Sequence, residues 1–217
     1  MKVEIWSDIM CPFCFIGKRK FETALAQFAG KEQVEIVWKS FQLQPDLITD
    51  TSKNISEHLA EVKGWKLEQT QKMYQQLVET GKLVGIEFNV DKIVVANTFK
   101  AQNLVHIAKA QGKQNEMEER LFEAYFTEGK NVDDIPTLIN MATEAGLNVE
   151  GMKEALENEN YADKVQTDIT EAQQLGVRGV PFFIFNRKYS VSGAQDPSVF
   201  LETLEKASSN KQYTMMV

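Results

Sequence analysis

The chain is poor in the residues that build covalent or metal-bound scaffolds, with only two cysteines and two histidines among its 217 residues. Two cysteines form at most one disulfide within the chain, so a fold held together by several disulfides is excluded. A structural zinc site needs four ligands, and His58 and His106 lie far from each other and from both cysteines in the sequence. Half a zinc site built on the cysteines is therefore the weaker alternative, and no metal is predicted.

The sequence also lacks a long apolar run and an excess of basic residues. No stretch is long enough to span a bilayer, and the N-terminus shows no leader pattern, which predicts a cytoplasmic protein without a membrane partner. The net charge of −7 argues against a nucleic-acid-binding surface. Because cytosolic thiols are kept reduced, a cysteine pair there is expected to be catalytic or metal-binding. The oligomeric state is not indicated.

Two strands around one helix are predicted at the start of the chain. Residues 2–8 alternate apolar and polar side chains, and residues 34–41 are β-branched and aromatic. Between them, apolar residues recur at helical spacing from Phe21 to Phe28, and Gly30 is expected to end that helix. This β-α-β order favours two parallel strands joined by a crossover helix.

The middle of the chain, residues 53–160, is predicted to be helical with no convincing strand. Asp134 is the expected N-cap of one helix, and Gly146 is expected to follow its end. The apolar stripe of that helix covers residues 135–142, and further helical stripes are predicted in this region and just after it at residues 67–84, 101–108, 117–126 and 161–175.

Strand character returns near the C-terminus. Residues 182–185 form a continuous apolar run, which is typical of a strand buried on both faces, and residues 189–192 are expected to pair with it. Asp196 and Pro197 predict the start of a last helix. Residues 211–217 are expected to fray or to dock on the rest of the molecule.

The two cysteines lie in the motif Cys11-Pro12-Phe13-Cys14, at the junction between the first strand and the first helix. Cys11 is predicted to be the helix N-cap, where free N–H groups and the positive end of the helix dipole favour a thiolate. Cys14 lies one turn further on, within reach of Cys11. These features predict Cys11 as the nucleophile and Cys14 as the resolving thiol of a redox pair.

A second motif, Gly-Val-Arg-Gly-Val-Pro at residues 176–181, directly precedes the apolar strand. The chain resembles the thioredoxin superfamily in four motifs. They are this one, the Cys-Pro-Phe-Cys motif, the Trp-Ser-Asp that precedes the cysteines, and Ser-Gly-Ala-Gln at residues 192–195. Within the superfamily the chain is most similar to the DsbA family, and in particular to FrnE-type cytoplasmic oxidoreductases. The resemblance covers nearly the whole chain.

This resemblance implies an α/β thioredoxin-like fold with a large all-helical insertion. Residues 1–52 and 161–217 would form the thioredoxin-like domain, and residues 53–160 the insertion. It also implies a cis bond between Val180 and Pro181, with this loop facing the cysteines and the Val180 backbone pairing with an extended substrate.

Two departures from the family pattern stand out. Phe13 occupies a position that is histidine in DsbA and gives a thiolate no hydrogen bond, which predicts a weaker oxidant than DsbA. Ile5 stands where many superfamily members carry an acidic residue, and Asp8 is assigned no role. Met10, Phe13, Phe15 and Phe182 are candidates for an apolar rim that receives flexible protein segments, with burial in the core as the alternative for Phe15 and Phe182.

The predicted function is thiol–disulfide exchange with protein thiols or disulfides, including disulfide isomerisation as an activity. One alternative is a glutathione-dependent transferase of the kappa class or a 2-hydroxychromene-2-carboxylate isomerase, which use a single serine or cysteine. The other is a chaperone-like or redox-sensing binding module without catalysis. No cofactor is predicted, and glutathione is the one candidate co-substrate.

Overall fold

The central strand of the fold is β1 (Lys2–Ser7), which pairs on both sides within a four-stranded sheet of order β2-β1-β3-β4. It runs parallel to β2 (Glu35–Ser40) and antiparallel to β3 (Phe182–Phe185), which in turn pairs with β4 (Tyr189–Ser192). The predicted strands are therefore present, and the opening β-α-β unit is parallel. One neighbour of β1 comes from the start of the chain and the other from near its end.

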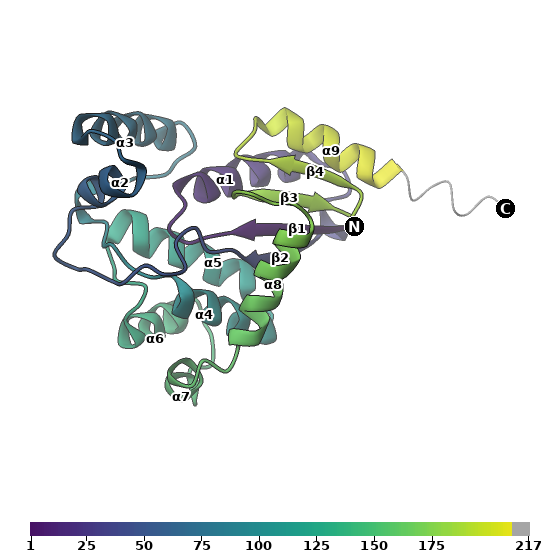
Figure 1. Cartoon of the computed structure of the whole chain (residues 1–217). Helices are drawn as coiled ribbons and strands as arrows, with labels where there is room; N and C mark the ends of the chain where they lie inside the picture. The colour runs from purple at the N-terminus through teal and green to yellow at the C-terminus, as the bar shows by residue number, and fades with distance from the viewer. Residues whose placement is uncertain (210–217) are drawn as a thin grey trace.

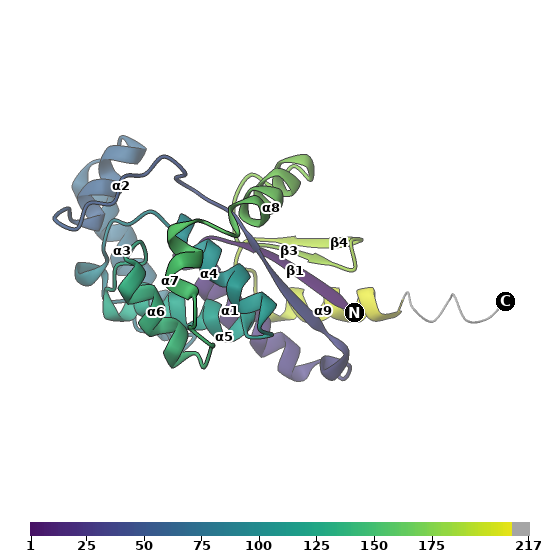
Figure 2. The same ribbon diagram turned by 90° about the horizontal axis from the view of Figure 1, so that it is seen from below.

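The computed structural model describes residues 1–209, so the predicted docking or fraying segment 211–217 lies outside the described residues. Helices α1 (Pro12–Gln27) and α9 (Pro197–Ser209) lie together on one face of the sheet, and α8 (Ala162–Gln174) lies on the other (Figure 2). The face under α1 and α9 is closed by packed phenylalanine rings from helices and strands: Phe21, Phe183, Phe185 and Phe200.

A helical lobe lies between β2 and α8 in the chain and beside the sheet in space (Figure 1). Its longer helices are α2 (Ile55–Lys63), α3 (Leu67–Lys82), α4 (Phe99–Ala110), α5 (Gln114–Phe122), α6 (Ile135–Glu144) and α7 (Met152–Glu157). The lobe also contains the 3-10 turn η2 (Val90–Lys92) and the π-helical η3 (Glu123–Glu128), while a further 3-10 turn, η1 (Lys31–Gln33), lies outside it between α1 and β2. The β pairing described in this lobe is one isolated bridge from Val95 to Asp50.

The end of α1 differs from the sequence prediction, which placed the stop at Gly30. The helix ends at Gln27, and Phe28 is the C-cap, with an extended backbone whose N–H bonds to the carbonyl groups of Ala24 and Leu25. Gly30 has a φ of −95° and lies under the Phe28 ring, where an added Cβ would be 2.8 Å from Phe28 Cε1. The glycine is therefore needed for close approach rather than for a left-handed turn.

The predicted helix 117–126 is also divided in the structure. It begins earlier, at Gln114, and after Phe122 its last turn widens into the π-helical η3. Phe122 and Phe126 stack beside Phe15 of α1, with ring centroids 5.1 and 6.3 Å from the Phe15 ring. These aromatic contacts join the helical lobe to the helix that carries the cysteines.

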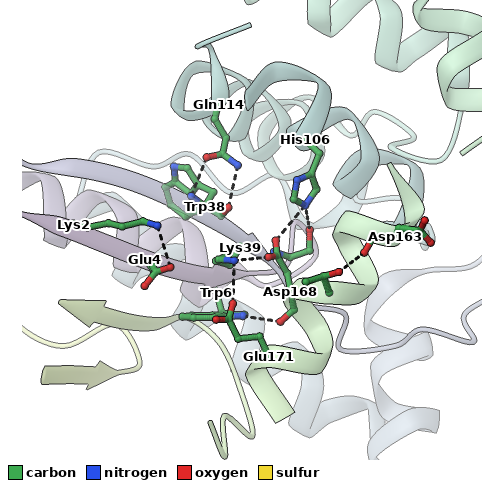
Figure 3. Close-up of polar contacts among 12 residues, drawn as sticks. Lys2, Glu4, Trp6, Trp38, Lys39, His106, Gln114, Asp163, Asp168 and Glu171 are labelled. Carbon is green, nitrogen blue, oxygen red and sulfur yellow. Dashed lines mark hydrogen bonds and ion pairs between the residues drawn. The ribbon is translucent and has the colours of Figure 1, made fainter. Parts of the chain in front are cut away.

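A buried polar cluster fixes α8 to β2 (Figure 3). Asp168 of α8 accepts hydrogen bonds from the Lys39 ammonium at 2.6 Å and from the Ser40 backbone N–H at 3.0 Å. Its other contact is with His106 Nε2 of α4, at 3.2 Å, while its backbone carbonyl accepts from the Trp6 indole at 3.0 Å. One carboxylate thus ties together a strand and two helices.

Helix α5 is fixed on both sides. The side-chain amide of Gln114 accepts from the Trp38 backbone N–H at 3.1 Å and donates to the Trp38 carbonyl at 3.0 Å, as a neighbouring strand would (Figure 3). On the other side, Glu119 pairs with Arg19 and with Lys18 of α1. These contacts set the orientation of the α5 residues that face inward.

Candidate active site at the start of helix α1

The site begins at Cys11, which is the N-cap of α1 with φ −91° and ψ 107°, followed by Pro12 in the first turn. The Cys11 N–H bonds to the Asp8 carbonyl at 2.9 Å, so the chain turns sharply between β1 and the helix. Cys14 is held one turn on, since its N–H bonds to the Cys11 carbonyl at 3.0 Å. Both are free thiols, with 5% and 1% of their surface exposed.

The loop before β3 faces the cysteines. The bond between Val180 and Pro181 is cis, and the Cys11 thiol donates to the Val180 carbonyl at 3.5 Å. Gly17 of α1 lies directly beneath this loop, because an added Cβ there would be 2.9 Å from Pro181 Cγ. The absence of a side chain at position 17 therefore lets the loop approach the helix that carries the thiols.

Cys14 lies in a buried environment of its own. Burial, together with the neighbouring Cys11, raises the pKa of the Cys14 thiol well above its usual range. The Asp8 N–H and the Ser7 hydroxyl lie close enough to the sulfur to act in the opposite direction. At neutral pH Cys14 is accordingly held as a thiol, while Cys11 is the sulfur nearer the surface.

Asp8 is fully buried beside the motif and organises the surrounding backbone. Its carboxylate accepts from the Leu43 N–H at 2.7 Å and from the Met10 N–H at 3.4 Å. Burial raises the pKa of Asp8 to about 6 in spite of these hydrogen bonds and of the nearby Thr98. The residue left without a role in the sequence analysis therefore links the cysteine turn to the loop after β2.

The predicted apolar rim is present only in part. Phe13 is 50% exposed, and Leu43, which the sequence analysis did not name, is 45% exposed on the loop tied to Asp8. Met10 and Phe182 are half-buried. Phe15 is a core residue, buried and stacked against the Phe122 and Phe126 rings of the helical lobe.

Neither histidine is brought to the cysteines. His58 bonds to Gln44 at 2.9 Å, and His106 bonds to Ser40 and Asp168. Within residues 1–209 no group of three or more histidine, cysteine, aspartate or glutamate side chains is arranged to hold a metal. In the same range no helix is long and apolar enough to cross a bilayer.

Two residues near Cys14 were missed from sequence, Ser7 at the end of β1 and Glu118 on α5. Glu118 is only 2% exposed, and burial raises its pKa to about 7. A signal was available, because Glu118 shares helical spacing with Leu121, Phe122 and Tyr125, all of which are buried. A carboxylate within an apolar stripe marks a buried charge rather than a solvated face.

Known proteins with similar sequences share this cysteine-containing domain. The model of the DSBA-like thioredoxin domain matches residues 2–205 of the chain. The chain belongs to the DsbA-like thioredoxin family. This DsbA-like protein is 32% identical over 219 residues to the uncharacterised protein YwbO of Bacillus subtilis (strain 168), a match that covers 97% of this chain and 96% of that protein.

Solved structures agree with this assignment. The DsbA-like chain is similar to a probable DsbA oxidoreductase from Streptomyces coelicolor, with 35% identity, a TM-score of 0.89, and coverage of 96% of this chain and 90% of that one. The cytosolic disulfide reductase DsbM from Pseudomonas aeruginosa matches at 16% identity with a TM-score of 0.65, over 99% of this chain and 98% of DsbM, which shows a shared fold. The predicted family and thioredoxin-like fold are confirmed.

Proposed function

We propose that the protein catalyses thiol–disulfide exchange with protein substrates through Cys11 and Cys14. The observation that carries this proposal is the placement of the Cys11 thiol at the start of α1, 3.5 Å from the Val180 carbonyl, with Cys14 one turn behind it. In this arrangement the Cys11 sulfur can react with the substrate, and the Cys14 sulfur can then attack Cys11 from the next turn of the helix.

The exchange proceeds in two displacements. The Cys11 thiolate attacks one sulfur of a substrate disulfide, a Cys11–substrate bond forms, and the other substrate sulfur leaves with the electron pair. Cys14, after losing its proton, attacks the Cys11 sulfur and releases the second substrate sulfur as a thiolate. The substrate is reduced by two electrons and the enzyme is left with a Cys11–Cys14 disulfide. The reverse sequence oxidises a dithiol substrate.

Substrate is proposed to lie along Val180 as an extended segment. Pro181 has no N–H, and the half-buried Val180 is next to the attacking sulfur. The exposed side chains of Phe13, in the cysteine motif, and Leu43, on the loop tied to Asp8, offer apolar contacts to such a segment. Unfolded or flexible protein segments are the class of substrate that such a surface favours.

The test uses insulin reduction and trapping with single cysteine variants. Cys11→Ser is expected to abolish turnover, and Cys14→Ser is expected to stop after one covalent adduct that dithiothreitol releases. An adduct on Cys14 rather than on Cys11 would contradict the assigned roles. Reactivation of scrambled ribonuclease separates the proposed isomerase activity from simple reduction.

The competing proposal is a glutathione-dependent transferase or isomerase, in which glutathione is the co-substrate and Cys14 is dispensable. A 2-hydroxychromene-2-carboxylate isomerase has the same fold, at 15% identity and a TM-score of 0.69. Turnover that requires glutathione and survives Cys14→Ser would favour it. Partner binding that survives loss of both cysteines, in a chain without exchange activity, would favour a binding module. A cytoplasmic location and the FrnE-type subtype stay predictions of the sequence.

A further inference from the structure

Behind the cysteine pair lies a buried hydroxyl that the exchange steps above do not use. Ser7 is the last residue of β1 and is 2% exposed, and its Oγ is buried without a hydrogen bond of normal geometry to the described residues. Its backbone is fixed, because the Ser7 carbonyl accepts from the Phe41 N–H at 3.0 Å and from Gln102 Nε2 at 3.2 Å. The position of this hydroxyl is therefore determined by the sheet.

The Ser7 hydroxyl lies near two groups that can hold a proton, Cys14 and Glu118. It is close enough to Cys14 Sγ and to the Glu118 carboxyl to lower the pKa of both. The three groups come from three elements: Ser7 from β1, Cys14 from α1 and Glu118 from α5. A hydroxyl both donates and accepts a hydrogen bond, so it can pass a proton from one neighbour to the other.

Among residues 1–209 no ion pair joins Glu118 directly to a cation. The nearby cation, Lys18, pairs instead with Glu22 and with Glu119, at 2.5 and 2.6 Å. The charged and titratable groups that face Glu118 are Lys18 from α1, Asp8 from the β1–α1 turn and Glu119 from its own helix. The contacts of Gln114 with Trp38 and of Glu119 with α1 fix the helix that carries the Glu118 carboxyl.

Cys14 needs such a partner because it is a thiol at neutral pH. Burial and the neighbouring Cys11 raise the pKa of Cys14 well above its usual range, so at pH 7 this residue is held as a thiol. Only the thiolate attacks a disulfide. Burial raises the pKa of Glu118 to about 7, so this carboxyl both gains and loses a proton near neutrality.

We propose that Glu118 accepts the proton of Cys14 through the Ser7 hydroxyl as Cys14 resolves the mixed disulfide. This inference rests on the proposed exchange function. The Cys14 proton moves to Ser7 Oγ as the Ser7 proton moves to Glu118. The Cys14 sulfur then bonds to the Cys11 sulfur, and the substrate sulfur leaves as a thiolate with the electron pair. The substrate disulfide is the oxidant, and in the reverse direction Glu118 returns the proton to Cys14.

The test separates the two displacements with an aromatic disulfide that releases a coloured thiolate. The reduced enzyme releases one thiolate when Cys11 attacks and a second when Cys14 resolves. In the wild type the rate of the second phase is expected to rise with pH through a midpoint near 7, as Glu118 loses its proton. Glu118→Gln is expected to slow that phase by about tenfold or more at pH 7.5, to remove the midpoint and to leave the first phase unchanged.

Matched variants make the result decisive. Glu116→Gln makes the same charge change at an exposed position of α5 and is expected to leave both phases unchanged. Ser7→Ala is expected to slow the second phase as Glu118→Gln does, and the double variant is expected to be no slower than either single variant. The unchanged first phase serves in each case as the measure of a folded site.

Three results would overturn the inference and leave the proposed function standing, and a fourth would overturn the proposed function on which the inference rests. A midpoint retained in Glu118→Gln assigns the proton to another acceptor or to solvent. A midpoint lost in Asp8→Asn but kept in Glu118→Gln assigns it to Asp8. Additive effects of Ser7→Ala and Glu118→Gln exclude a shared path. A wild type that shows no second phase at all, with Cys14 still titratable, instead contradicts exchange between Cys11 and Cys14.

Discussion

At the scale of single residues, the active site depends on groups that are small or buried rather than on groups that the motif displays. Gly17 allows the Val180–Pro181 loop to approach α1, and Ser7 places a hydroxyl behind Cys14. Asp8 ties the cysteine turn to Leu43. The visible Cys-x-x-Cys motif supplies the reacting sulfurs, and these neighbours set the geometry in which they react.

Replacement of Gly17 by alanine tests this dependence. The added Cβ would lie 2.9 Å from Pro181 Cγ and 3.5 Å from Phe183 Cζ, so the loop has to move away from Cys11. Exchange with insulin is expected to fall several-fold, although alanine favours helix by about 1 kcal/mol over glycine. Gly179→Ala is the control, because its Cβ would meet nothing within 4 Å. Equal activity in both variants would show that close loop approach is unimportant.

At the scale of elements, α5 replaces a missing strand partner for β2. The Gln114 amide satisfies both backbone groups of the buried Trp38, and the same helix carries Glu118. The contact between Gln114 and Trp38 could not be predicted from the sequence, because a hydrogen bond between a side chain and a distant strand edge leaves no periodic pattern there.

Gln114→Ala is expected to reduce the free energy of unfolding by about 2 kcal/mol or more, since it leaves a buried N–H and a buried carbonyl unpaired. Urea unfolding measures the change. Gln111 gives a matched control, because its amide clamps both backbone groups of Asn148 in the same way but at an exposed site. A loss in Gln111→Ala as large as that in Gln114→Ala would show that burial of the clamp is not what matters.

Elements whose ends depend on local chemistry could be predicted from the sequence, and those that depend on distant contacts could not. The strands, the N-cap position of Cys11 and the cap at Asp134 follow from local chemistry, and the structure agrees with each. The end of α1 at Phe28, the π turn after Phe122 and the burial of Phe15 depend on contacts between distant elements. Glu118 could have been recognised as a buried acid, but its neighbours could not.

At the scale of the whole molecule, Asp168 joins α8, β2 and α4, and α8 leads directly into the loop that faces Cys11. Burial alone would raise the pKa of Asp168, but hydrogen bonds from His106, Lys39 and the Ser40 N–H hold it below its ordinary value. A lowered carboxyl pKa contributes stability above the unfolded-state value, and that contribution is lost as pH falls through the folded-state value.

Asp168→Asn is therefore expected to lower the free energy of unfolding by about 3 kcal/mol at pH 7, the lower end for a broken buried pair, because Lys39 keeps Glu171 at 3.0 Å. The difference from the wild type is expected to shrink below about pH 4. Urea unfolding at both pH values checks this, with Glu157→Gln in an exposed pair as the control. A difference that stays constant with pH would contradict an electrostatic origin.

The pairing of β1 with β2 on one side and β3 on the other has a consequence for synthesis on the ribosome. Residues 1–40 can form their helix and parallel pair early, but β3 begins only at Phe182. Until then the nascent chain carries both thiols, and one edge of its innermost strand, without the loop that will cover them. Newly made chains are thus open to unwanted disulfides and to edge association for most of translation, and completion of about the last sixth of the chain, from Phe182 onward, ends that exposure.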